Sequence, residues 1–537
     1  MTTFSAFQND IFSEIETGRG NLVIRARAGT GKSFTLVHSA RRAKGVGLFL
    51  AFNKAIAVEN ERKLKGTEME SKTVHSCGLR ALTKHVGGRV TIDSKGRKYR
   101  DMIDMWVEDV LAPTYKDMYA DIWPTDTERD ILDECGVSDD IVRLCDLARN
   151  AMWDPRKSAD STLSDIIAHY DLDVCPGLEN LTLKVVRWAL TKGLAVKNIA
   201  DFTDMLWLPV MHGATFRTYM WVFVDECQDL SPLRLEIAMR SVSKSGRMVF
   251  VGDDCQAIYG FAGADTESFD NVIKRAQGKV LPLPICYRCP TSHIALANAI
   301  VPDIVAREGA EEGSVRHVPE GDLAHDVEDK TALVLCRVNA PLFRHAYALI
   351  AKGRKVAIAG RDLGAGLKAV IRHVFGKRHS DTFTHSEFMS KLTTYKSAQM
   401  VKLSEKYEEK AFEAQCERLT DKVDCLAAVC EANPEANTCK KLRAAIDDVF
   451  NCKNPDILFS SVHRAKGLEH TNVYILNPEK LGVGRRELDA EGNLHWQDDQ
   501  EKNLQYVAYT RSMSDLVFLA KTEKKKTDKK DKVAQVA

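Results

Sequence analysis

The stretch NLVIRARAGTGKSFTLV, residues 21–37, decides the fold class of this chain. It predicts a short apolar strand, a glycine-rich loop and the start of a helix. Gly29 and Gly31 let backbone N–H groups curl around phosphate oxygens, and the helix that follows adds the positive end of its dipole. The strict pattern has glycine where this chain has Ala26, but the combination still predicts the P-loop of a nucleotide hydrolase.

The side chains of this loop have separate expected tasks. Lys32 reaches the β- and γ-phosphates of a nucleotide, and the Ser33 hydroxyl binds Mg²⁺. A nucleoside triphosphate and Mg²⁺ are therefore the ligands that the loop predicts. The residues expected to surround the phosphates are Ala28, Gly29, Thr30, Gly31, Lys32 and Ser33.

A second motif, WVFVDECQDLS at residues 221–231, predicts an apolar strand that ends in two acidic side chains. Asp225 is suited to hold Mg²⁺ through water, and Glu226 to polarise the water that attacks the γ-phosphate. Two adjacent buried acids would be costly without a cation beside them. The motif therefore predicts the catalytic partner of the P-loop.

A third strand begins the segment MVFVGDDCQAIYGFAGAD, residues 248–265. Its Gln256 is an uncharged group able to contact a γ-phosphate and a second ligand at once. Phe261 is a candidate for stacking on a base, a contact worth roughly 1–3 kcal/mol. Taken alone, an aromatic residue at such a position is more often part of a core.

The short apolar runs of the chain predict two α/β domains. Each run is followed by a helix-like stretch, which is typical of buried strands in a parallel sheet. Two intervening segments, near 85–200 and 371–451, are predicted to be helical insertions, and the second to form a solvent-exposed helical hairpin rather than a self-associating coiled coil. The runs lie at residues 21–26, 46–52, 221–226 and 248–253, and at residues 332–337, 355–360, 457–463, 472–477 and 515–520.

Size and composition predict a soluble protein of several domains. The chain has 537 residues, of which 44% are hydrophobic and 28% charged, and its net charge is +1. No apolar run approaches the roughly 20 residues that a membrane helix needs, and the polar N-terminus does not resemble a secretory signal. A cytoplasmic location is therefore expected, with no membrane partner and with the 14 cysteines reduced. The balanced charge leaves nucleic-acid binding open, because clustering matters more than the total.

Six segments occur in an order that other classes of P-loop protein do not match. They are ARAGTGKS, VDECQDLS, VGDDCQAIYGFAGA, LPICYRCP, SSVHRAKGLEH and QYVAYTRS. In this order they resemble the superfamily 1A DNA helicases of the UvrD/Rep/PcrA type. LFLAFNKAIAVE and KTVHSCGLRAL are most similar to the F-box DNA helicase branch. The resemblance implies two RecA-like P-loop domains with ATP bound between them.

The resemblance also implies four subdomains and a charged tail. RecA-like domain 1A would comprise residues 1–85 and 200–280, with residues 86–199 as its helical insertion 1B. RecA-like domain 2A would comprise residues 281–370 and 452–522, with residues 371–451 as the insertion 2B, which is much shorter than in UvrD. The lysine-rich residues 523–537 are expected to be disordered.

Several roles at the ATP site follow from the resemblance alone. Gln8 matches the glutamine that recognises adenine, Tyr287 the aromatic ring that stacks on it, and Glu469 the carboxylate that meets the ribose. Arg288 and Arg511 match two arginine fingers that neutralise charge on the γ-phosphate. The catalytic set that the motifs imply is Lys32, Asp225, Glu226, Gln256, Arg288 and Arg511, with Gln256 as γ-phosphate sensor.

The implied DNA contacts depart from the family pattern. Relatives usually carry tryptophan and arginine where this chain has Phe261 and Ala262, and Phe52 is one position away from the usual aromatic residue. An aromatic side chain is retained, but one nucleotide contact is in question. The residues in motifs that line the single-strand path are Phe52, Asn53, His75, Phe261 and His463.

The implied function is an ATP-dependent helicase or translocase that moves 3′ to 5′ on single-stranded DNA and couples hydrolysis to strand separation. Its expected partners are single-stranded DNA, junctions of single- and double-stranded DNA, and replication or repair proteins, and a monomer is expected. Two alternatives stay open: a translocase that displaces proteins from DNA without processive unwinding, and a DNA-binding scaffold with a vestigial ATPase. RNA is not excluded as a substrate, because stacking surfaces accept either backbone.

Overall fold

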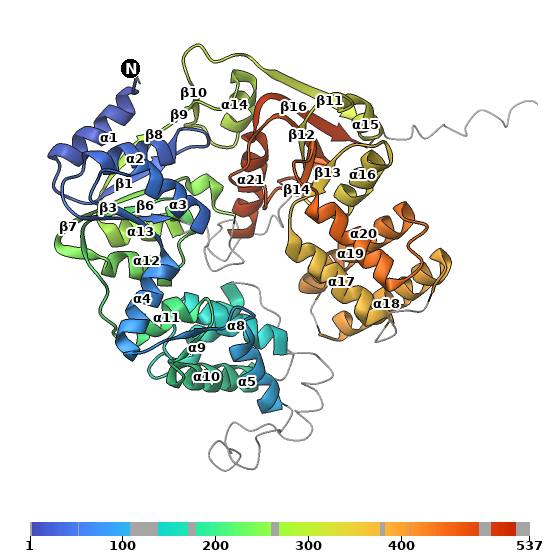
Figure 1. The fold of residues 1–537 in the computed structure, drawn as a ribbon, viewed down its shortest axis with the longest axis horizontal. Coiled ribbons are helices and arrows are strands. Elements are labelled where there is room, and N and C mark those ends of the chain that lie inside the picture. The colour runs from blue at the N-terminus through green and yellow to red at the C-terminus, as the bar shows by residue number, and fades with distance from the viewer. Residues whose placement is uncertain are drawn as a thin grey trace, which may run out of the picture.

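Two parallel sheets of six strands each form the framework of the structure (Figure 1). This computed structural model describes residues 3–51, 53–107, 138–169, 179–258, 268–375, 382–406, 409–482 and 496–521. All nine predicted apolar runs contain a strand, and the strand pairs within both sheets are parallel. The predicted α/β class with two P-loop-type sheets is therefore confirmed.

The first sheet has the strand order β3-β2-β6-β7-β1-β8. The strand before the P-loop, β1, lies between β7 and β8, and its side chains alternate between two cores, with Leu22 and Ile24 in one and Val23 in the other. Because parallel strands end at the same edge, the segments after β1, β6 and β7 meet there. The strands are β1 (Leu22–Ala26), β2 (Gly47–Ala51), β3 (Met69–Thr73), β6 (Tyr219–Val224), β7 (Val242–Gly252) and β8 (Lys279–Leu283).

Helices cover both faces of the first sheet, as expected for buried parallel strands. One face packs against α1 (Ala6–Thr17) and α2 (Lys32–Arg42). The other face packs against α4 (Val74–Val86), α11 (Asp204–Met211), α12 (Pro232–Arg240) and α13 (Ser268–Ala276). Helix α3 (Lys54–Lys63) follows β2 and contacts β3.

The second sheet has the strand order β11-β16-β15-β12-β14-β13. A short pair, β9 (Ile285–Cys286) with β10 (Val305–Ala306), lies between the two sheets (Figure 1). The strands are β11 (Ser314–Pro319), β12 (Ala332–Cys336), β13 (Val356–Ile358), β14 (Ile457–Ser461), β15 (His470–Leu476) and β16 (Ser512–Ala520). The helices of this half are α14 (Thr291–Asn298), α15 (Leu323–Asp326), α16 (Ala340–Ala351), α17 (Arg361–Phe375) and α21 (Trp496–Tyr509).

Each half carries a mainly helical part beside its sheet (Figure 1). The first comprises α5 (Arg97–Val107), α8 (Ser138–Asn150), α9 (Asp160–His169) and α10 (Glu179–Ala195), with the strand pair β4 (Thr91–Ile92) and β5 (Ile199–Ala200). The second comprises α18 (His385–Lys406), α19 (Glu409–Ala432) and α20 (Cys439–Asn451). The exact domain boundaries stay predictions.

The predicted helical hairpin near 371–451 has its two helices, α18 and α19, in contact. Its predicted exposure to solvent is wrong for the second half of α19. Val423, Leu426 and Val429 are buried in the same core as the second sheet, because α19 packs against α16. Cys425 is buried with them as a small apolar side chain.

The sequence predicted neither a membrane-spanning helix nor a disulfide. None of the described helices is both long enough and apolar enough to cross a membrane. None of the described cysteines forms a disulfide. The reduced thiols expected from the sequence agree with this part of the structure.

A buried charge network joins the first helical part to α11, one of the helices that cover the first sheet. Asp204, at the start of α11, is fully buried and accepts hydrogen bonds from Lys98 Nζ at 2.5 Å, Tyr99 Oη at 2.9 Å and Arg149 Nη1 at 2.9 Å. Arg149 also contacts Asp201 at 2.9 Å. A single carboxylate therefore joins α5, α8 and α11, and its removal leaves two buried cations without their shared partner.

We expect Asp204→Ala to lower the stability of this part by about 3–5 kcal/mol, because breaking a buried ion network leaves uncompensated charge. Urea unfolding followed by tryptophan fluorescence would measure the loss. Glu59→Ala, which removes an exposed i,i+4 pair with Lys63, is the matched control and should leave the midpoint unchanged. Equal, small effects of both substitutions would contradict the structural role of Asp204.

Candidate active site

The P-loop residues form a cradle of backbone N–H groups at the start of α2. Gly29 and Gly31 have φ values of 68° and 75°, which lie in the left-handed region that glycine adopts without strain. Within the described part of the chain, no acceptor pairs with the backbone N–H groups of Gly29, Gly31, Lys32 or Ser33. The predicted conformation of the loop is thus present, and these amides can bind phosphate oxygens.

Lys32 and Glu226 face each other across this cradle, with 3.4 Å between Lys32 Nζ and Glu226 Oε2. Burial lowers the pKa of Lys32, but the nearby carboxylates of Glu226, Asp253 and Asp225 outweigh it, so that the pKa is raised overall. Lys32 is therefore a buried, permanent cation at the predicted phosphate position.

Asp225 and Ser33 meet beside the lysine, as the two motifs predict. The Ser33 hydroxyl donates a hydrogen bond of 2.7 Å to Asp225 Oδ2. Burial and the adjacent Glu226 raise the pKa of Asp225, which indicates a carboxylate that gains from a further cation. A hydroxyl and a carboxylate oxygen are the ligand types that Mg²⁺ prefers, so this pair fits a magnesium ion.

Glu226 has an unusual backbone conformation. Its φ of 51° and ψ of 46° lie in the left-handed region, a strained state for a residue other than glycine. Gln228 Nε2 donates to Glu226 Oε2 at 2.6 Å. Burial raises the pKa of Glu226, but Lys32 and Lys466 outweigh this effect and lower it overall, so the side chain is an ionised carboxylate.

Gln256 lies directly after β7, at the same edge of the sheet. Its Nε2 donates to Asp253 Oδ2 at 2.5 Å, and the residue is almost fully buried. Asp253 also influences the pKa of Lys32. Gln256 is thus connected to the phosphate cradle through one carboxylate.

Arg511 approaches the cradle from the second half of the chain. It is buried, and its guanidinium donates to the carbonyl oxygens of Val507 at 2.9 Å and Leu468 at 3.1 Å. No described carboxylate lies within ion-pairing distance of it. Burial and the neighbouring Arg288 lower the pKa of Arg511 to about 10. Such a cation favours an anion beside it, and it is close enough to affect the pKa of Lys32.

Arg288 and Tyr287 follow β9 and lie next to the P-loop. Tyr287 N–H donates to the Gly29 carbonyl at 2.9 Å, and the Tyr287 side chain is 44% exposed. Arg288 Nη2 pairs with Glu469 Oε2 at 2.5 Å. A Cβ atom at Gly29 would lie 2.7 Å from Arg288 Cβ, so the second half of the chain also requires glycine at this position.

Gln8 is buried, and its amide is partly used within the protein. Nε2 donates to Thr35 Oγ1 at 3.1 Å, and Oε1 accepts from Ser5 N–H at 3.0 Å. One N–H and one lone pair remain for a base. Phe34 follows Ser33 and its side chain is 43% exposed. It was not among the residues predicted for the ATP site.

Sequence comparison assigns both halves of the chain to known domain families. Residues 8–277 match the UvrD/REP helicase N-terminal domain, and residues 326–523 match the UvrD-like helicase C-terminal domain. The first match alone covers half of the chain. The chain belongs to the UvrD/Rep helicase family.

Individual members of this helicase family share little sequence identity with the chain. DNA helicase II of Salmonella typhimurium is 22% identical over 311 residues, which are 54% of this chain and 39% of that protein. ATP-dependent DNA helicase UvrD2 of Mycobacterium tuberculosis is 25% identical over 308 residues, or 53% of this chain and 41% of that protein. The chain thus spans about two fifths of these relatives. Arterivirus nonstructural protein 10 (helicase) matches 95% of this chain and 62% of its own, at 11% identity and a TM-score of 0.32.

The predicted DNA contacts of this helicase-family chain are only partly described. Phe52 and Phe261 lie outside the described residues. Asn53 caps α3, because its Oδ1 accepts from Ile56 N–H at 2.9 Å. His75 is half-buried, and its ring meets that of Phe202 edge-on at 6.2 Å. His463 lies beside Arg337 and Arg464, and burial together with these charges lowers its pKa to about 3.

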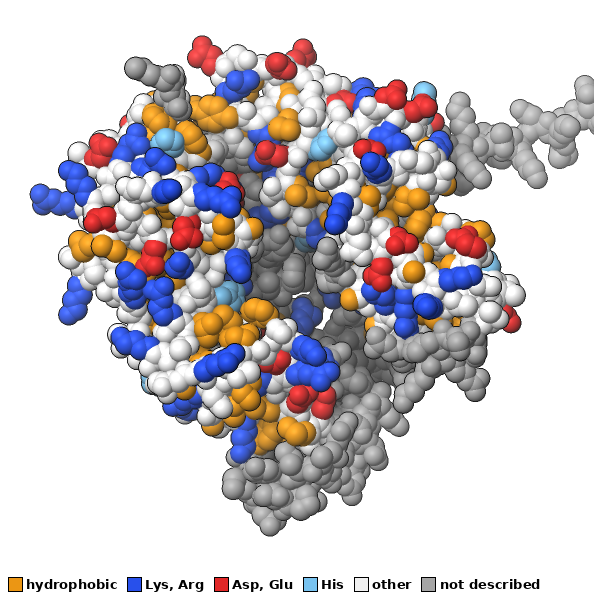
Figure 2. All heavy atoms as spheres, in the orientation of Figure 1, with side chains coloured by type: hydrophobic (Ala, Val, Ile, Leu, Met, Phe, Trp, Pro, Cys, Tyr) orange, Lys and Arg blue, Asp and Glu red, His pale blue; other side chains and the backbone are white. Residues whose placement is uncertain are grey.

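Phe202, which lies between β5 and α11, was not among the predicted DNA contacts. It is 55% exposed, whereas the aromatic residues of the sheets are buried. In Figure 2, acidic and basic side chains are interspersed over both halves of the chain. The face shown is hollowed between the two halves.

Several hydrogen bonds and one ion pair between the two halves of the chain were not predicted from the sequence. Lys466 Nζ contacts both carboxylate oxygens of Asp229 at 2.7 Å and the Gln256 carbonyl at 2.7 Å. Tyr506, on α21, contacts the backbone of Ala28. These partners are more than 200 residues apart in the chain, so no local pattern could have identified them.

We expect Glu226→Gln to keep ATP binding and to reduce hydrolysis by at least about a hundredfold, because an amide cannot accept a proton from the attacking water. Isothermal titration with ATP and a phosphate-release assay would separate the two effects. Glu59→Gln, which changes an exposed carboxylate on α3, is the matched control. Turnover at the wild-type rate in the Glu226 variant would remove Glu226 as the base.

Proposed function

We propose that this chain is an ATP-dependent DNA helicase that moves 3′ to 5′ along single-stranded DNA. One observation carries the proposal. Arg511, a buried cation with no described carboxylate partner, approaches Lys32 and Glu226 from the opposite sheet. A phosphate group between them would join the two halves of the chain. The names of the relatives, which are DNA helicases, support DNA as the substrate.

Hydrolysis in this proposal begins with a change of partner for Lys32. When phosphates bind in the cradle, Lys32 turns from Glu226 to the phosphate oxygens. Glu226 then loses its nearest cation, 3.4 Å away, and its pKa rises, which makes it a better proton acceptor. Glu226 takes the proton from the attacking water. Ser33 and Asp225 would hold Mg²⁺, which would supply positive charge against the phosphates.

Domain closure follows from where the cations lie. Lys32 belongs to the first half, whereas Arg288 and Arg511 belong to the second. The triphosphate binds both halves, but the diphosphate lacks the group that Arg511 would contact. ATP therefore favours the closed arrangement and ADP releases it, because a ligand shifts an equilibrium by its differential affinity for the two states. This cycle is what a motor requires.

The proposed grip on DNA relies on stacking. Phe202 offers an exposed ring next to His75. Stacking on aromatic side chains tolerates every base, so the grip would be independent of sequence. Strand separation and displacement of bound proteins are both possible outputs of such a motor, and the similarity to the F-box branch keeps the second open.

Arg511→Ala should lower kcat for ATP by about 10³-fold and change ATP affinity far less, because a finger contacts the charge that develops in the transition state. The coupled ATPase assay and equilibrium ATP binding measure the two quantities. Since Arg511 is buried, Arg288→Ala, whose side chain is 20% exposed, serves as a second variant that spares the core. A loss of affinity alone, in both variants, would contradict the finger assignment.

The proposed substrate is tested by ATPase activity with single-stranded DNA, duplex DNA and RNA. We expect stimulation by single-stranded DNA, and a weaker stimulation in Phe202→Ala at unchanged basal activity. Met220→Ala is the control. It truncates a 43% exposed side chain near the start of β6, whereas the predicted ATP site lies where β6 ends. Tailed duplexes of each polarity and a protein-bound DNA then distinguish unwinding from protein displacement. Absence of any DNA stimulation would favour the scaffold alternative.

A further inference from the structure

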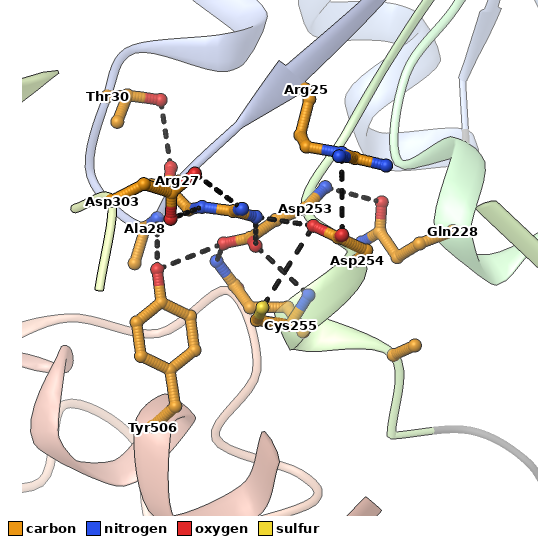
Figure 3. Close-up of polar contacts among 12 residues, drawn as sticks. Arg25, Arg27, Ala28, Thr30, Gln228, Asp253, Asp254, Cys255, Asp303 and Tyr506 are labelled. Carbon is orange, nitrogen blue, oxygen red and sulfur yellow. Dashed lines mark hydrogen bonds and ion pairs between the residues drawn. The ribbon is translucent and has the colours of Figure 1, made fainter. Parts of the chain in front are cut away.

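Arg27, the second residue of the P-loop, has a role that the phosphate cradle does not explain. Its side chain points away from the loop and into a cluster of acidic residues (Figure 3). It is only 7% exposed. Arg27 Nη1 contacts Asp253 Oδ1 at 3.3 Å and also binds Asp254. Both carboxylates follow β7 in the first half of the chain.

The third partner of Arg27 comes from the second half. Asp303 accepts two hydrogen bonds of 2.7 Å, from Nε to Oδ1 and from Nη2 to Oδ2. Such bidentate geometry is the strong form of an arginine–carboxylate pair. Asp303 follows α14, and α14 packs against α21 and β11. The P-loop is thus tied directly to the structure that carries Arg511.

A second contact between the halves lies one residue further along the loop. The Tyr506 hydroxyl accepts a hydrogen bond from Ala28 N–H at 2.8 Å and donates to Asp253 Oδ2 at 3.3 Å. Tyr506 is fully buried on α21 (Figure 3). The Ala28 amide is therefore used for contact with the second half, whereas the amides of Gly29, Gly31, Lys32 and Ser33 have no acceptor among the described residues and stay available to phosphate.

Asp253 connects both contacts to the nucleotide site. Its carboxylate accepts from Arg27, from Tyr506 and from Gln256 Nε2, the last at 2.5 Å. Its backbone N–H donates to Gln228 Oε1 at 3.1 Å, and Gln228 in turn donates to Glu226. A movement of α21 would therefore reach the predicted γ-phosphate sensor and the predicted base through Asp253.

We propose that Arg27 and Tyr506 are positioning residues that form a cross-domain brace with Asp303 and Asp253, and that this brace holds the P-loop and Gln256 in place while the two halves are closed. The inference rests on the proposed function and deepens it by naming what connects closure to the catalytic groups.

The cluster Asp253, Asp254 and Cys255 could instead be regarded as a cation site, since their ligand atoms lie within 4.8 Å of one another. Arg27 already fills that role. Its guanidinium is bonded to both aspartates, and Arg25 Nε lies 3.5 Å from Asp254. The brace therefore accounts for these acids without a metal.

Hydrogen–deuterium exchange tests the brace directly, because the Ala28 amide is one of its bonds. In Tyr506→Phe, the peptide that contains Ala28 should exchange about tenfold faster than in the wild type, since one hydrogen bond is worth about one power of ten. Tyr509→Phe removes a hydroxyl from the same helix whose partner among the described residues is Gln505, so the exchange of the Ala28 peptide should be unchanged in this control. Equal exchange in all three proteins would overturn the brace.

Kinetics test its positioning role. Tyr506→Phe and Asp303→Asn should each lower kcat for DNA-stimulated ATP hydrolysis by about tenfold, with KM for ATP changed less than about threefold. Asp303 is 56% exposed, so the asparagine variant should fold normally. A variant with faster exchange but wild-type kcat would show a purely structural contact. If the wild-type protein itself hydrolyses no ATP, the proposed function fails, while the exchange experiment still decides whether the brace exists.

Discussion

The positive charge of Lys32 and Arg511, which lies between the two sheets, is the constraint on which the arrangement of the site depends. Lys32, whose side chain is 11% exposed, and the fully buried Arg511 bring two cations toward one region, and of these two only Lys32 has a carboxylate within ion-pairing distance among the described residues. Burying a cation without a matching anion is costly. A triphosphate would supply the missing negative charge, so the closed arrangement and the nucleotide stabilise each other. The two halves of the chain are thus linked by electrostatics, and each alone provides half of a site.

The parallel sheets make this arrangement possible. Because parallel strands end at one edge, β1, β6 and β7 deliver Lys32, Asp225 and Asp253 to the same place. The second half of the chain presents the helix α21 and the segment after β9 toward that edge. The strained conformation of Glu226 fits the same view, since strain of this kind is kept where the surrounding contacts fix a side chain for a task.

The sequence predicted the first half of the site because its residues sit at strand ends that apolar patterns identify. Lys32, Ser33, Asp225 and Glu226 could each be assigned from a strand followed by a loop. The predicted finger roles of Arg288 and Arg511 required the family resemblance, because nothing in a local pattern distinguishes such an arginine from a surface arginine. Arg27 and Asp303 could not be found at all, since they are 276 residues apart and each is an ordinary charged residue until the fold joins them. The burial of α19 was missed for the same reason, because its partner α16 is distant in sequence.

Gly29 brings these constraints together at one backbone position. Its φ of 68° is required by the shape of the phosphate cradle, and its missing side chain is required by Arg288 and Cys286, which approach within 2.7 Å of a hypothetical Cβ. Its carbonyl accepts from Tyr287 N–H, and the preceding amide donates to Tyr506. The loop that holds the phosphates is therefore also a surface on which the second half rests. Movement of the second half must change the surroundings of the loop, and the proposed coupling of hydrolysis to motion would depend on these contacts.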